Sequence, residues 1–447
     1  MNPSGLQVEQ TLLALLTQII LILVAARVVG LVFHRLSQPR VCGEIAAGLI
    51  LGPSLFGKLA PQFFHAVFNP QLDLVISMFS QVGLILLLFL VGLEFDFRHV
   101  RVHSKKAFSI SLAGIVLPFV LGLISARALQ STISTRIDSR GFALFMATAM
   151  SITALPILGR ILIEFNLHRT ELGALVITAA AVDDATGWII LAIVTAIVRS
   201  NFQIMRALLL VSEVAVYAVF MILIARPLLS RWIRNMHLGP DRAISLTNFT
   251  IVLVTVFVSA IVTNLIGIFS VLGGFMVGAI LYDQHHFRTA ISQRLTDFTA
   301  AFFLPLFFIY TGLRTDWGTM HGSQAWRLFA VVLLAAFTGK FGGCTIAARI
   351  TGMSLVDSCC VGVLMNTRGL MELVVANLGL DLGVIPRDIF FMLVMMALIS
   401  TFMAAPVLRL LIQKSELEAP LSQSEPMTRS TSVPSLQRAT YRTATER

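Results

Sequence analysis

Residues 176–190 read Val-Ile-Thr-Ala-Ala-Ala-Val-Asp-Asp-Ala-Thr-Gly-Trp-Ile-Ile, which places two adjacent carboxylates, Asp183 and Asp184, in an otherwise apolar stretch. No other charge occurs between residues 172 and 198, a length that can cross a hydrocarbon core about 30 Å thick as one helix. Each ionised carboxylate at that depth costs at least about 2.5 kcal/mol. Because adjacent helical residues diverge by about 100°, the two carboxylates cannot face one partner. The pair therefore indicates divided roles toward a partner, water or a bound cation, unless it is only a structural hydrogen-bonding pair.

The composition predicts a membrane protein throughout. Only 13% of the 447 residues are Asp, Glu, Lys or Arg and 57% are apolar, whereas soluble proteins carry about 25% charge. Runs that are apolar on every face exclude a transmembrane β-barrel, whose strands alternate. We predict an all-α polytopic membrane protein with about 13 transmembrane helices. The predicted spans cover residues about 12–33, 40–59, 72–93, 106–128, 140–163, 172–199, 205–228, 245–265, 267–282, 297–313, 326–349, 357–380 and 388–412.

The distribution of basic residues predicts the orientation. The chain has 33 Lys and Arg against 23 Asp and Glu, a formal charge of +10, but no basic module interleaved with aromatic residues, so nucleic acid is not an expected partner. The arginines concentrate in alternate loops, as the positive-inside rule requires of cytoplasmic loops. We expect the N-terminus outside and the C-terminus inside a bacterial inner membrane. Residues 1–413 would form the transmembrane domain, and residues 414–447 a disordered cytoplasmic tail.

Two sequence matches indicate an internal repeat. Residues 43–51, Gly-Glu-Ile-Ala-Ala-Gly-Leu-Ile-Leu, match residues 273–281, Gly-Gly-Phe-Met-Val-Gly-Ala-Ile-Leu, with both glycines in register. The ends of the third and tenth spans match through Gly92 and Gly312. Both matches pair a span with the seventh span after it, so paired spans cross the membrane in opposite senses. We predict two inverted six-helix repeats joined by a linker helix, an arrangement typical of secondary transporters. Their bounds are about 10–200 and 243–413, with the linker at about 205–228.

Two spans are interrupted at corresponding positions of these repeats. Residues 151–159, Ser-Ile-Thr-Ala-Leu-Pro-Ile-Leu-Gly, place Pro156 in the middle of a predicted helix, where it removes a backbone hydrogen bond. Residues 366–372, Asn-Thr-Arg-Gly-Leu-Met-Glu, weaken the twelfth span and put Arg368 near mid-depth, where it cannot face lipid. Half-helix ends supply carbonyls for a cation and dipoles for charge. The two breaks therefore point to a substrate site, unless they are ordinary kinks.

Other charged residues also fall inside predicted spans. Lys340 lies near mid-membrane, where a lysine is costly unless it pairs with a carboxylate or extends to the interface. Glu213, in the seventh span, belongs to no broken helix, and we expect a structural or interfacial role for it. Glu44, Glu94 and Asp96 lie near span ends and are expected to be interfacial anchors.

Six segments carry a family resemblance. They are GEIAAGLILGPSLFG from Gly43, LFLVGLEFD from Leu88, SITALPILGRIL from Ser151, AAAVDDATGW from Ala179, FFLPLFFIYTGL from Phe302 and NTRGLMELVVANLGLDLGV from Asn366. Through them the chain resembles the monovalent cation:proton antiporters of the Na+/H+ exchanger superfamily, in the branch of NapA, the Kef systems and the plant cation/H+ exchangers. The resemblance implies an NhaA/NapA-like fold with crossed broken helices, a homodimer, a panel of spans 1–3 and 8–10, and a moving core of spans 4–6 and 11–13.

The resemblance also implies a function, which is exchange of Na+ or K+, or of Li+, for H+ by alternating access, with no enzymatic reaction and no cofactor. Asp184 would be the ligand for which cation and proton compete, and Asp183 would partner Lys340. Thr153 and nearby backbone carbonyls would complete the cation shell. In such relatives two aspartates and a lysine accompany electrogenic exchange, which we expect here. The residues implied to stabilise the broken helices are Ser151, Pro156, Asn366, Thr367, Arg368 and Glu372.

Three alternatives stay open. A cation channel, or a K+ efflux protein like the Kef systems, could use the same buried acids. A Na+-coupled carrier of organic solutes would need room and polar anchors for a larger substrate. An intramembrane aspartyl protease would need paired aspartates, for which Asp283 and Asp381 are the candidates, but both lie at span ends without a Gly-x-Gly-Asp motif.

Overall fold

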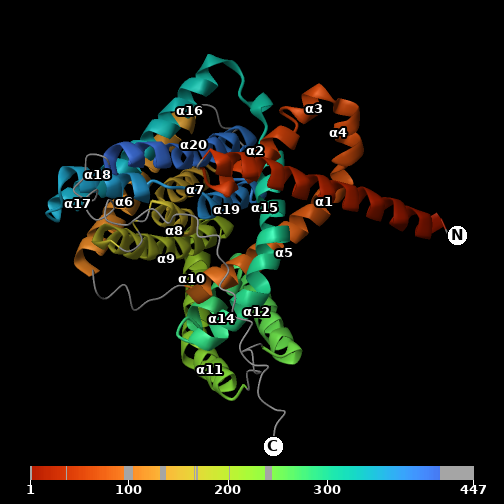
Figure 1. The fold of residues 1–447 in the computed structure, drawn as a ribbon, viewed down its shortest axis with the longest axis horizontal. Helices are drawn as coiled ribbons and strands as arrows, with labels where there is room; N and C mark the ends of the chain where they lie inside the picture. The colour runs from red at the N-terminus through yellow and green to blue at the C-terminus, as the bar shows by residue number, and fades with distance from the viewer. Residues whose placement is uncertain are drawn as a thin grey trace, which may run out of the picture.

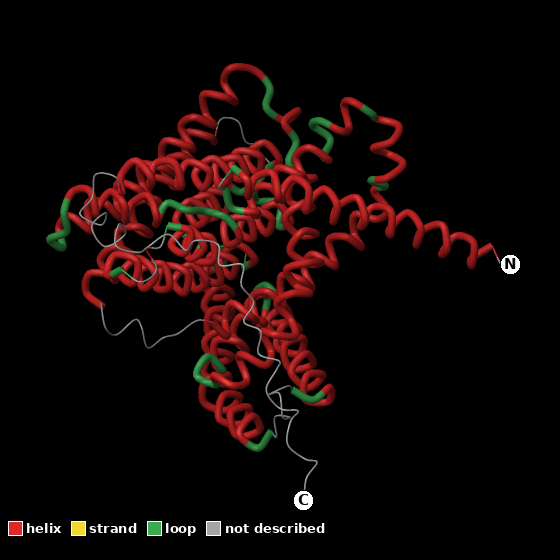
Figure 2. Tube along the Cα trace, in the orientation of Figure 1, coloured by secondary structure: helices red, strands yellow, loops and turns green. Residues whose placement is uncertain are grey.

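The computed structural model of the chain describes residues 3–36, 38–94, 104–130, 137–165, 167, 170–200, 202–236 and 244–412. All regular structure within these ranges is helical, and the described residues contain no β-strand (Figures 1 and 2). Long helices are the expected form of so apolar a sequence, because a helix satisfies its own backbone hydrogen bonds inside a hydrocarbon phase.

The helices follow one another with short connections. Those before residue 200 are α1 (Pro3–Arg35), α2 (Arg40–Leu51), α3 (Phe56–Leu59), α4 (Pro61–Val67), α5 (Pro70–Glu94), α6 (Ser104–Leu129), α7 (Ser139–Ser151), α8 (Leu155–Glu164) and α9 (Glu171–Arg199). The linker region forms α10 (Ile204–Phe220), the π-helical segment η4 (Met221–Ala225) and α11 (Arg226–Arg234). The remainder comprises α12 (Leu246–Ile266), α13 (Ser270–Ile280), α14 (His285–Phe298), η5 (Thr299–Phe303), α15 (Leu304–Leu313), η6 (Trp317–Thr319), α16 (Gly322–Phe337), η7 (Thr338–Gly342), α17 (Gly343–Ile350), α18 (Leu355–Met365), α19 (Leu370–Asp381) and α20 (Arg387–Ile412).

When helices are counted as membrane spans by their length and apolar composition, the structure has fewer spans than the sequence predicts. Among the described residues ten helices are long and apolar enough to cross a membrane, and α18 with α19, bent by 42° at the break between them, adds an eleventh. The predicted fifth span is divided into α7 and α8, of 13 and 10 residues, and the predicted ninth span is α13, of 11 residues. A helix of 11 residues rises about 16 Å, about half of the hydrocarbon thickness. The all-helical, multi-span fold is confirmed, and the count of thirteen is not.

One predicted loop is a helix. Residues 283–296 were expected to connect the ninth and tenth spans, but α14 begins at His285 and continues through η5 into α15. Phe287, Ile291 and Leu295 of α14 are buried, while most of its polar residues lie at the surface. The segment is thus an amphipathic helix. Its many polar residues lower the mean hydropathy of the segment, and this is why the sequence predicts a loop there. Asp96, the loop arginines Arg98, Arg101 and Arg169, and the tail from residue 414 lie outside the described residues.

The helices form two groups by their contacts. α5 packs along α13 and α15, and α2 packs along α1 and α15; with α12 and α14 these helices are called the panel group. α6 packs along α7, α9, α16 and α17, while α20 contacts α18 and α19; with α8 these helices are called the core group. α10 contacts α9 of the core group and α12 of the panel group. These two groups are the ones implied by the family resemblance.

Close helix contacts within the panel group depend on glycine. A Cβ atom added to Gly48 of α2 would lie 2.8 Å from the Cα of Gly312 in α15. A Cβ atom on Gly278 of α13 would lie 2.9 Å from the carbonyl carbon of Gly92 in α5. Real side chains do not tolerate such distances, so both backbones approach only because neither residue has a side chain. The four glycines are those that the two sequence matches paired.

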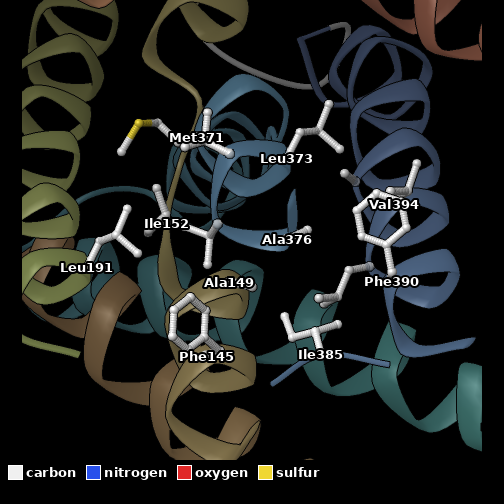
Figure 3. Close-up of a cluster of buried hydrophobic side chains, with 14 of the residues drawn as sticks. Phe145, Ala149, Ile152, Leu191, Met371, Leu373, Ala376, Ile385, Phe390 and Val394 are labelled. Atoms are coloured by element: carbon white, nitrogen blue, oxygen red, sulfur yellow. The ribbon is translucent and has the colours of Figure 1, made fainter. Parts of the chain in front are cut away.

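The largest buried cluster contains residues of the core group near the two helix breaks and extends into the panel group through residues such as Phe275 and Phe308. Figure 3 shows Phe145 and Ala149 of α7 facing Leu373 and Ala376 of α19, with side chains of α9 and α20 on either side. In α19 every residue from Leu370 to Asn377 is buried. The short non-helical segments at residues 152–154 and 366–369 are buried throughout, so close packing restrains their positions.

Candidate functional site

The two helix breaks cross each other inside the core group. Residues 152–154 separate α7 from α8, and residues 366–369 separate α18 from α19. The amide of Ala154 donates to the carbonyl of Thr367 at 3.1 Å, and the Thr153 hydroxyl donates to the carbonyl of Met365 at 3.1 Å. A break leaves buried backbone amides and carbonyls without partners inside their own helix. Here residues of the first break donate hydrogen bonds to carbonyls at the second break. The predicted crossing of the two broken helices is thus present.

The first break lies one turn before the proline that was expected to cause it. α7 ends at Ser151 and α8 begins at Leu155, so Pro156 is the second residue of α8 and does not interrupt a helix. The prediction of a mid-helix proline is wrong at this point. In the first turn of a helix the amide has no partner within that helix, so proline is tolerated there. Pro156 starts the second half-helix.

Asp183 of α9 connects the first break to Lys340 of η7 through hydrogen bonds. It is fully buried, and its Oδ2 accepts hydrogen bonds from the Thr153 amide at 2.8 Å and from the Lys340 ammonium at 2.9 Å. Lys340, also fully buried, donates a second bond to the carbonyl of Ser151, the last residue of α7. The lysine therefore neutralises one carboxylate and satisfies a free carbonyl at the end of a half-helix. Its place in a π-helical turn is typical of functional positions.

Asp184 has no such partners. Its side chain is 1% exposed, and its Oδ1 lacks a hydrogen-bond partner among the described residues, as does Oδ1 of Asp183. Trp188, one helical turn further along the same face of α9, stacks on Phe275 of α13 with ring centroids 5.5 Å apart. Asp184 therefore lies on the face of α9 that meets the panel group. A buried carboxylate without donors is stable only when it binds a proton or a cation.

Arg368 holds the second break. Its guanidinium is 1% exposed and donates to the carbonyls of Ala149 at 3.2 Å and Met150 at 2.9 Å, and it lies 3.5 Å from Glu372. A further bond reaches the carbonyl of Ala336, at 3.3 Å. The planar group thus caps the end of α7 from the opposite break, in keeping with the helix dipole, which favours a cation at a C-terminus.

Three other polar residues lie at the breaks: Thr401, which the sequence did not predict, and Thr367 and Asn366, which it did. Thr401 of α20 accepts a hydrogen bond from the Arg368 amide at 2.9 Å and donates to the carbonyl of Arg368. Thr367 uses its hydroxyl locally, on the carbonyl of Leu364 at 2.8 Å. The side-chain oxygen of Asn366 is buried without a hydrogen-bond partner in the described part of the chain. Thr401 resembles many other hydroxyl residues in apolar helices. The sequence shows only that the broken backbone at Arg368 needs hydrogen-bond partners, and it does not show which residue supplies them.

The remaining acidic candidates lie away from the breaks. Glu213 is exposed on α10. Asp283 pairs with Arg226 at 3.1 Å, and Asp381 pairs with Arg314 at 2.6 Å. Each of these two aspartates is thus engaged by its own arginine, on different helices of the fold. The arrangement gives no support to a pair of catalytic aspartates.

A small polar cavity lies between the two groups at the end of the molecule where α15 stops. Its volume is about 230 Å³, and its polar lining includes Ser80, Gln81, Arg199, Asn264, Arg314 and Asp381. Arg314, directly after α15, binds both Asp381 and, at 3.1 Å, the amide oxygen of Asn377 in α19. Asn377 in turn donates to Thr311 at 2.9 Å. These bonds join the panel group to the core group across the cavity.

Comparisons with known proteins agree with this architecture. Residues 20–414 match the family model described as sodium/hydrogen exchanger, transmembrane. Na(+)/H(+) antiporter NhaS4 of Synechocystis sp. is 40% identical over 403 residues, which cover 89% of this chain and 97% of that protein. Cation/H(+) antiporter 17 of Arabidopsis thaliana is 36% identical over 399 residues, covering 89% of this chain and 48% of the plant protein. The chain therefore spans about half the length of this plant relative.

A solved structure shares the fold. The sodium proton antiporter MjNhaP1 from Methanocaldococcus jannaschii, solved at pH 8, superposes with a TM-score of 0.65 at 15% sequence identity, covering 91% of this chain and 99% of that one. At that identity the likeness concerns the fold alone. The family model and the cyanobacterial relative extend it to the sequence, as the six motifs predicted. The chain belongs to the sodium/hydrogen exchanger family of transmembrane proteins.

Proposed function

We propose that this chain is a secondary transporter that exchanges a monovalent cation, Na+ or K+ with Li+ as a further candidate, for protons by alternating access. The observation that carries the proposal is the difference between the two aspartates. Asp183 is already neutralised by Lys340, whereas Asp184 is equally buried and has an oxygen without a donor. One buried carboxylate is thus left to take either a proton or a cation. The sodium/proton exchange named for the cyanobacterial relative supports the same activity here.

The proposed cation shell is built from oxygen atoms around Asp184. Asp183 retains an oxygen without a partner, and Thr153 and Asn366 add hydroxyl and amide oxygens at the two breaks. The carbonyls freed by the breaks complete the donor set. Carboxylate, hydroxyl and carbonyl oxygens suit a hard cation. A proton on Asp184 removes the negative charge that holds the cation, so the two substrates compete for one site.

Alternating access follows from the position of Asp184 at the boundary of the two groups. In the described structure Asp183 and Asp184 are 0% and 1% exposed, and Trp188 stacks on Phe275 where α9 meets α13. Movement of the core group against the panel group would expose Asp184 to one side at a time. The channel alternative would need a continuous open path, which a buried site does not favour. A carrier of organic solutes would need polar anchors in a site of about 300–1,000 Å³, but the polar cavity between the two groups holds about 230 Å³, and the cavity of about 640 Å³ between α9, α10 and α13 is lined almost entirely by apolar residues.

Four further features are part of the proposal. The swapped glycine contacts, Gly48 with Gly312 and Gly278 with Gly92, are what an inverted repeat would produce, because exchanging the repeats converts one contact into the other. The long α1, which extends beyond the body of the molecule in Figure 1, exposes apolar residues that a homodimer could cover. The positive-inside pattern of the loops supports an N-terminus outside and a C-terminus in the cytoplasm. The cyanobacterial relative favours a bacterial inner membrane.

The direct test uses purified protein in liposomes that contain a pH-sensitive dye. Na+, K+ and Li+ are added in turn to the outside, and an antiporter moves protons outward from the lumen in response to its substrate cation. Liposomes that receive choline instead should show no proton movement. A cation leak without coupled proton movement would turn the assignment to a channel, and uptake of labelled organic anions with Na+ would turn it to a solute carrier.

The pair of Lys340 and Asp183 should decide whether exchange moves net charge. Lys340→Gln leaves Asp183 as an unpaired buried carboxylate, which should lower the stability of the protein by about 3–5 kcal/mol. The double variant Asp183→Asn, Lys340→Gln removes both charges and should recover most of that loss. We expect the wild type to respond to membrane potential and the double variant, with one carboxylate left, to exchange without responding to it. An unchanged voltage response in an active double variant would remove the pair from charge movement.

The bond between Arg314 and Asp381 should act as a latch between the two groups. Both side chains are partly exposed, so the pair contributes no more than about 1 kcal/mol, or a factor of about five in an equilibrium. Asp381→Asn should therefore lower the half-saturating cation concentration on the side of this cavity and raise it on the opposite side. The exchanged pair, Arg314→Asp with Asp381→Arg, should restore both values. Equal changes on the two sides would indicate a structural effect instead of a latch.

A further inference from the structure

A wide apolar cavity lies outside the aspartate site. It has a volume of about 640 Å³ and runs between α9, α10 and α13, so that one wall belongs to the core group, one to the panel group and one to the linker. Its lining is almost entirely hydrocarbon. Three residues of its rim, Ile189, Ile193 and Ile222, are 61%, 41% and 52% exposed. The groove is therefore open sideways, toward the acyl chains of a membrane.

One end of the groove is polar and lies at the depth of lipid headgroups. Arg226 and Tyr282 form this end. Arg226 follows Ile204, where α10 begins, by 226 − 204 = 22 residues, or about 33 Å of helix, which matches a hydrocarbon core of about 30 Å. The ion pair with Asp283 uses one amino group of Arg226, whose side chain stays 38% exposed. Since a guanidinium has five N–H donors, several remain for another oxygen ligand.

The surroundings of this end are basic. Arg231 and Arg234 follow on α11, and neither forms an ion pair with any residue in the described ranges. Asp283 balances Arg226 alone, so the end of the groove carries an excess of positive charge. An apolar channel that ends at arginines is complementary to a molecule with a long hydrocarbon chain and an anionic head.

We propose that an anionic phospholipid of the surrounding bilayer binds in this groove, with one acyl chain between α9, α10 and α13 and its phosphate at Arg226. The chain would touch Ala185 and Trp188, which flank the aspartate pair on α9. If the core group moves as proposed above, the groove changes shape in each cycle, and a flexible chain can fill it in every state. The lipid would then set the rate of exchange, while its binding does not depend on the transport activity.

Binding is tested by photo-crosslinking, which requires no transport. The protein is reconstituted with a phosphatidylglycerol that carries a diazirine on its acyl chain, illuminated and digested, and the modified peptides are identified by mass spectrometry. We expect modification of the groove walls on α9, α10 and α13. Ala215→Trp, which fills the groove from α10, should reduce it by about fivefold or more. Val216→Trp is the matched control, because the neighbouring residue is 68% exposed and does not line the groove.

The headgroup is tested with Arg226→Gln, against Arg206→Gln as the control, because Arg206 is exposed at the opposite end of α10 and does not line the groove. Loss of Arg226 should lower modification by the phosphatidylglycerol probe about fivefold, the effect of one arginine near an anionic lipid, and leave a phosphatidylcholine probe unaffected. Equal labelling of Ala215→Trp and Val216→Trp would overturn the chain site. Equal labelling by both probes in the wild type would overturn the anionic headgroup. Labelling as expected in a protein that moves no protons would refute the proposed function and leave the lipid site standing.

Discussion

Replacing Asp184 by asparagine should abolish cation-driven proton movement in liposomes. Asparagine has nearly the same shape, but it cannot take up a proton and carries no charge to hold a cation. Losing the charged partner of a buried ion costs about 2–5 kcal/mol, so exchange should fall by about 100-fold or more. A variant that retains half of the wild-type rate would refute the assignment of Asp184 as the binding carboxylate.

The same variant should not be less stable than the wild type. In the described structure Asp184 is 1% exposed and has an oxygen without a donor, so removing its charge removes an uncompensated cost. Its midpoint of thermal unfolding in detergent should therefore equal or exceed that of the wild type. Ligands stabilise the state that they bind, and the wild type should unfold at a higher temperature when its cation is added. That cation-dependent increase should disappear in Asp184→Asn.

Glu213→Gln is the matched control for both measurements. It also neutralises a carboxylate within a membrane-spanning helix, but Glu213 is exposed on α10 and belongs to neither break. Exchange and the cation-dependent increase in unfolding temperature should both persist in this variant. If Glu213→Gln lost exchange as completely as Asp184→Asn, the loss would reflect removal of intramembrane charge in general. The assignment of Asp184 as the binding carboxylate would then be refuted.

The sequence predicts the central residues of the site well because burying charge in a membrane is costly. Asp183, Asp184, Lys340 and Arg368 each stand out in an apolar segment, and the structure buries all four around the crossing of the two breaks. Their cost in hydrocarbon makes each of them a candidate site residue without any knowledge of the fold. The glycines that the two sequence matches pair are informative for a similar reason, since only glycine permits the backbone contact of Gly48 with Gly312.

The partners of these charges are not visible in the sequence. Arg368 is held mainly by the carbonyls of Ala149, Met150 and Ala336, and a carbonyl is present at every residue. Thr401 looks like any other threonine of an apolar helix. The sequence predicts the first break at Pro156, but the chain leaves the helix at Ile152, through contacts with α9 and with the second break. Such contacts depend on tertiary structure and leave no local pattern.

Replacing Arg368 should strongly destabilise the protein. The guanidinium is fully enclosed, and its removal leaves three carbonyls without this donor and Glu372 without its cation. Breaking a buried ion pair by removing one partner costs about 3–5 kcal/mol. Arg368→Met, which keeps much of the side-chain volume, should therefore lower the midpoint of thermal unfolding far more than Arg387→Met, a change at the start of α20 outside the breaks.

The geometry of Arg368 gives a second, sharper expectation. Its two terminal nitrogens donate to carbonyls on α7 and α16, and one of them also approaches Glu372. Reaching these partners at once requires the several N–H donors of a planar guanidinium. Lysine keeps the charge but presents it at one point, so Arg368→Lys should recover little of the lost stability. The double variant Arg368→Met, Glu372→Gln should recover more, because it leaves no unpaired charge. If Arg368→Lys were as stable as the wild type, charge alone would suffice at this break, and the carbonyl contacts would contribute nothing to holding the crossed helices together.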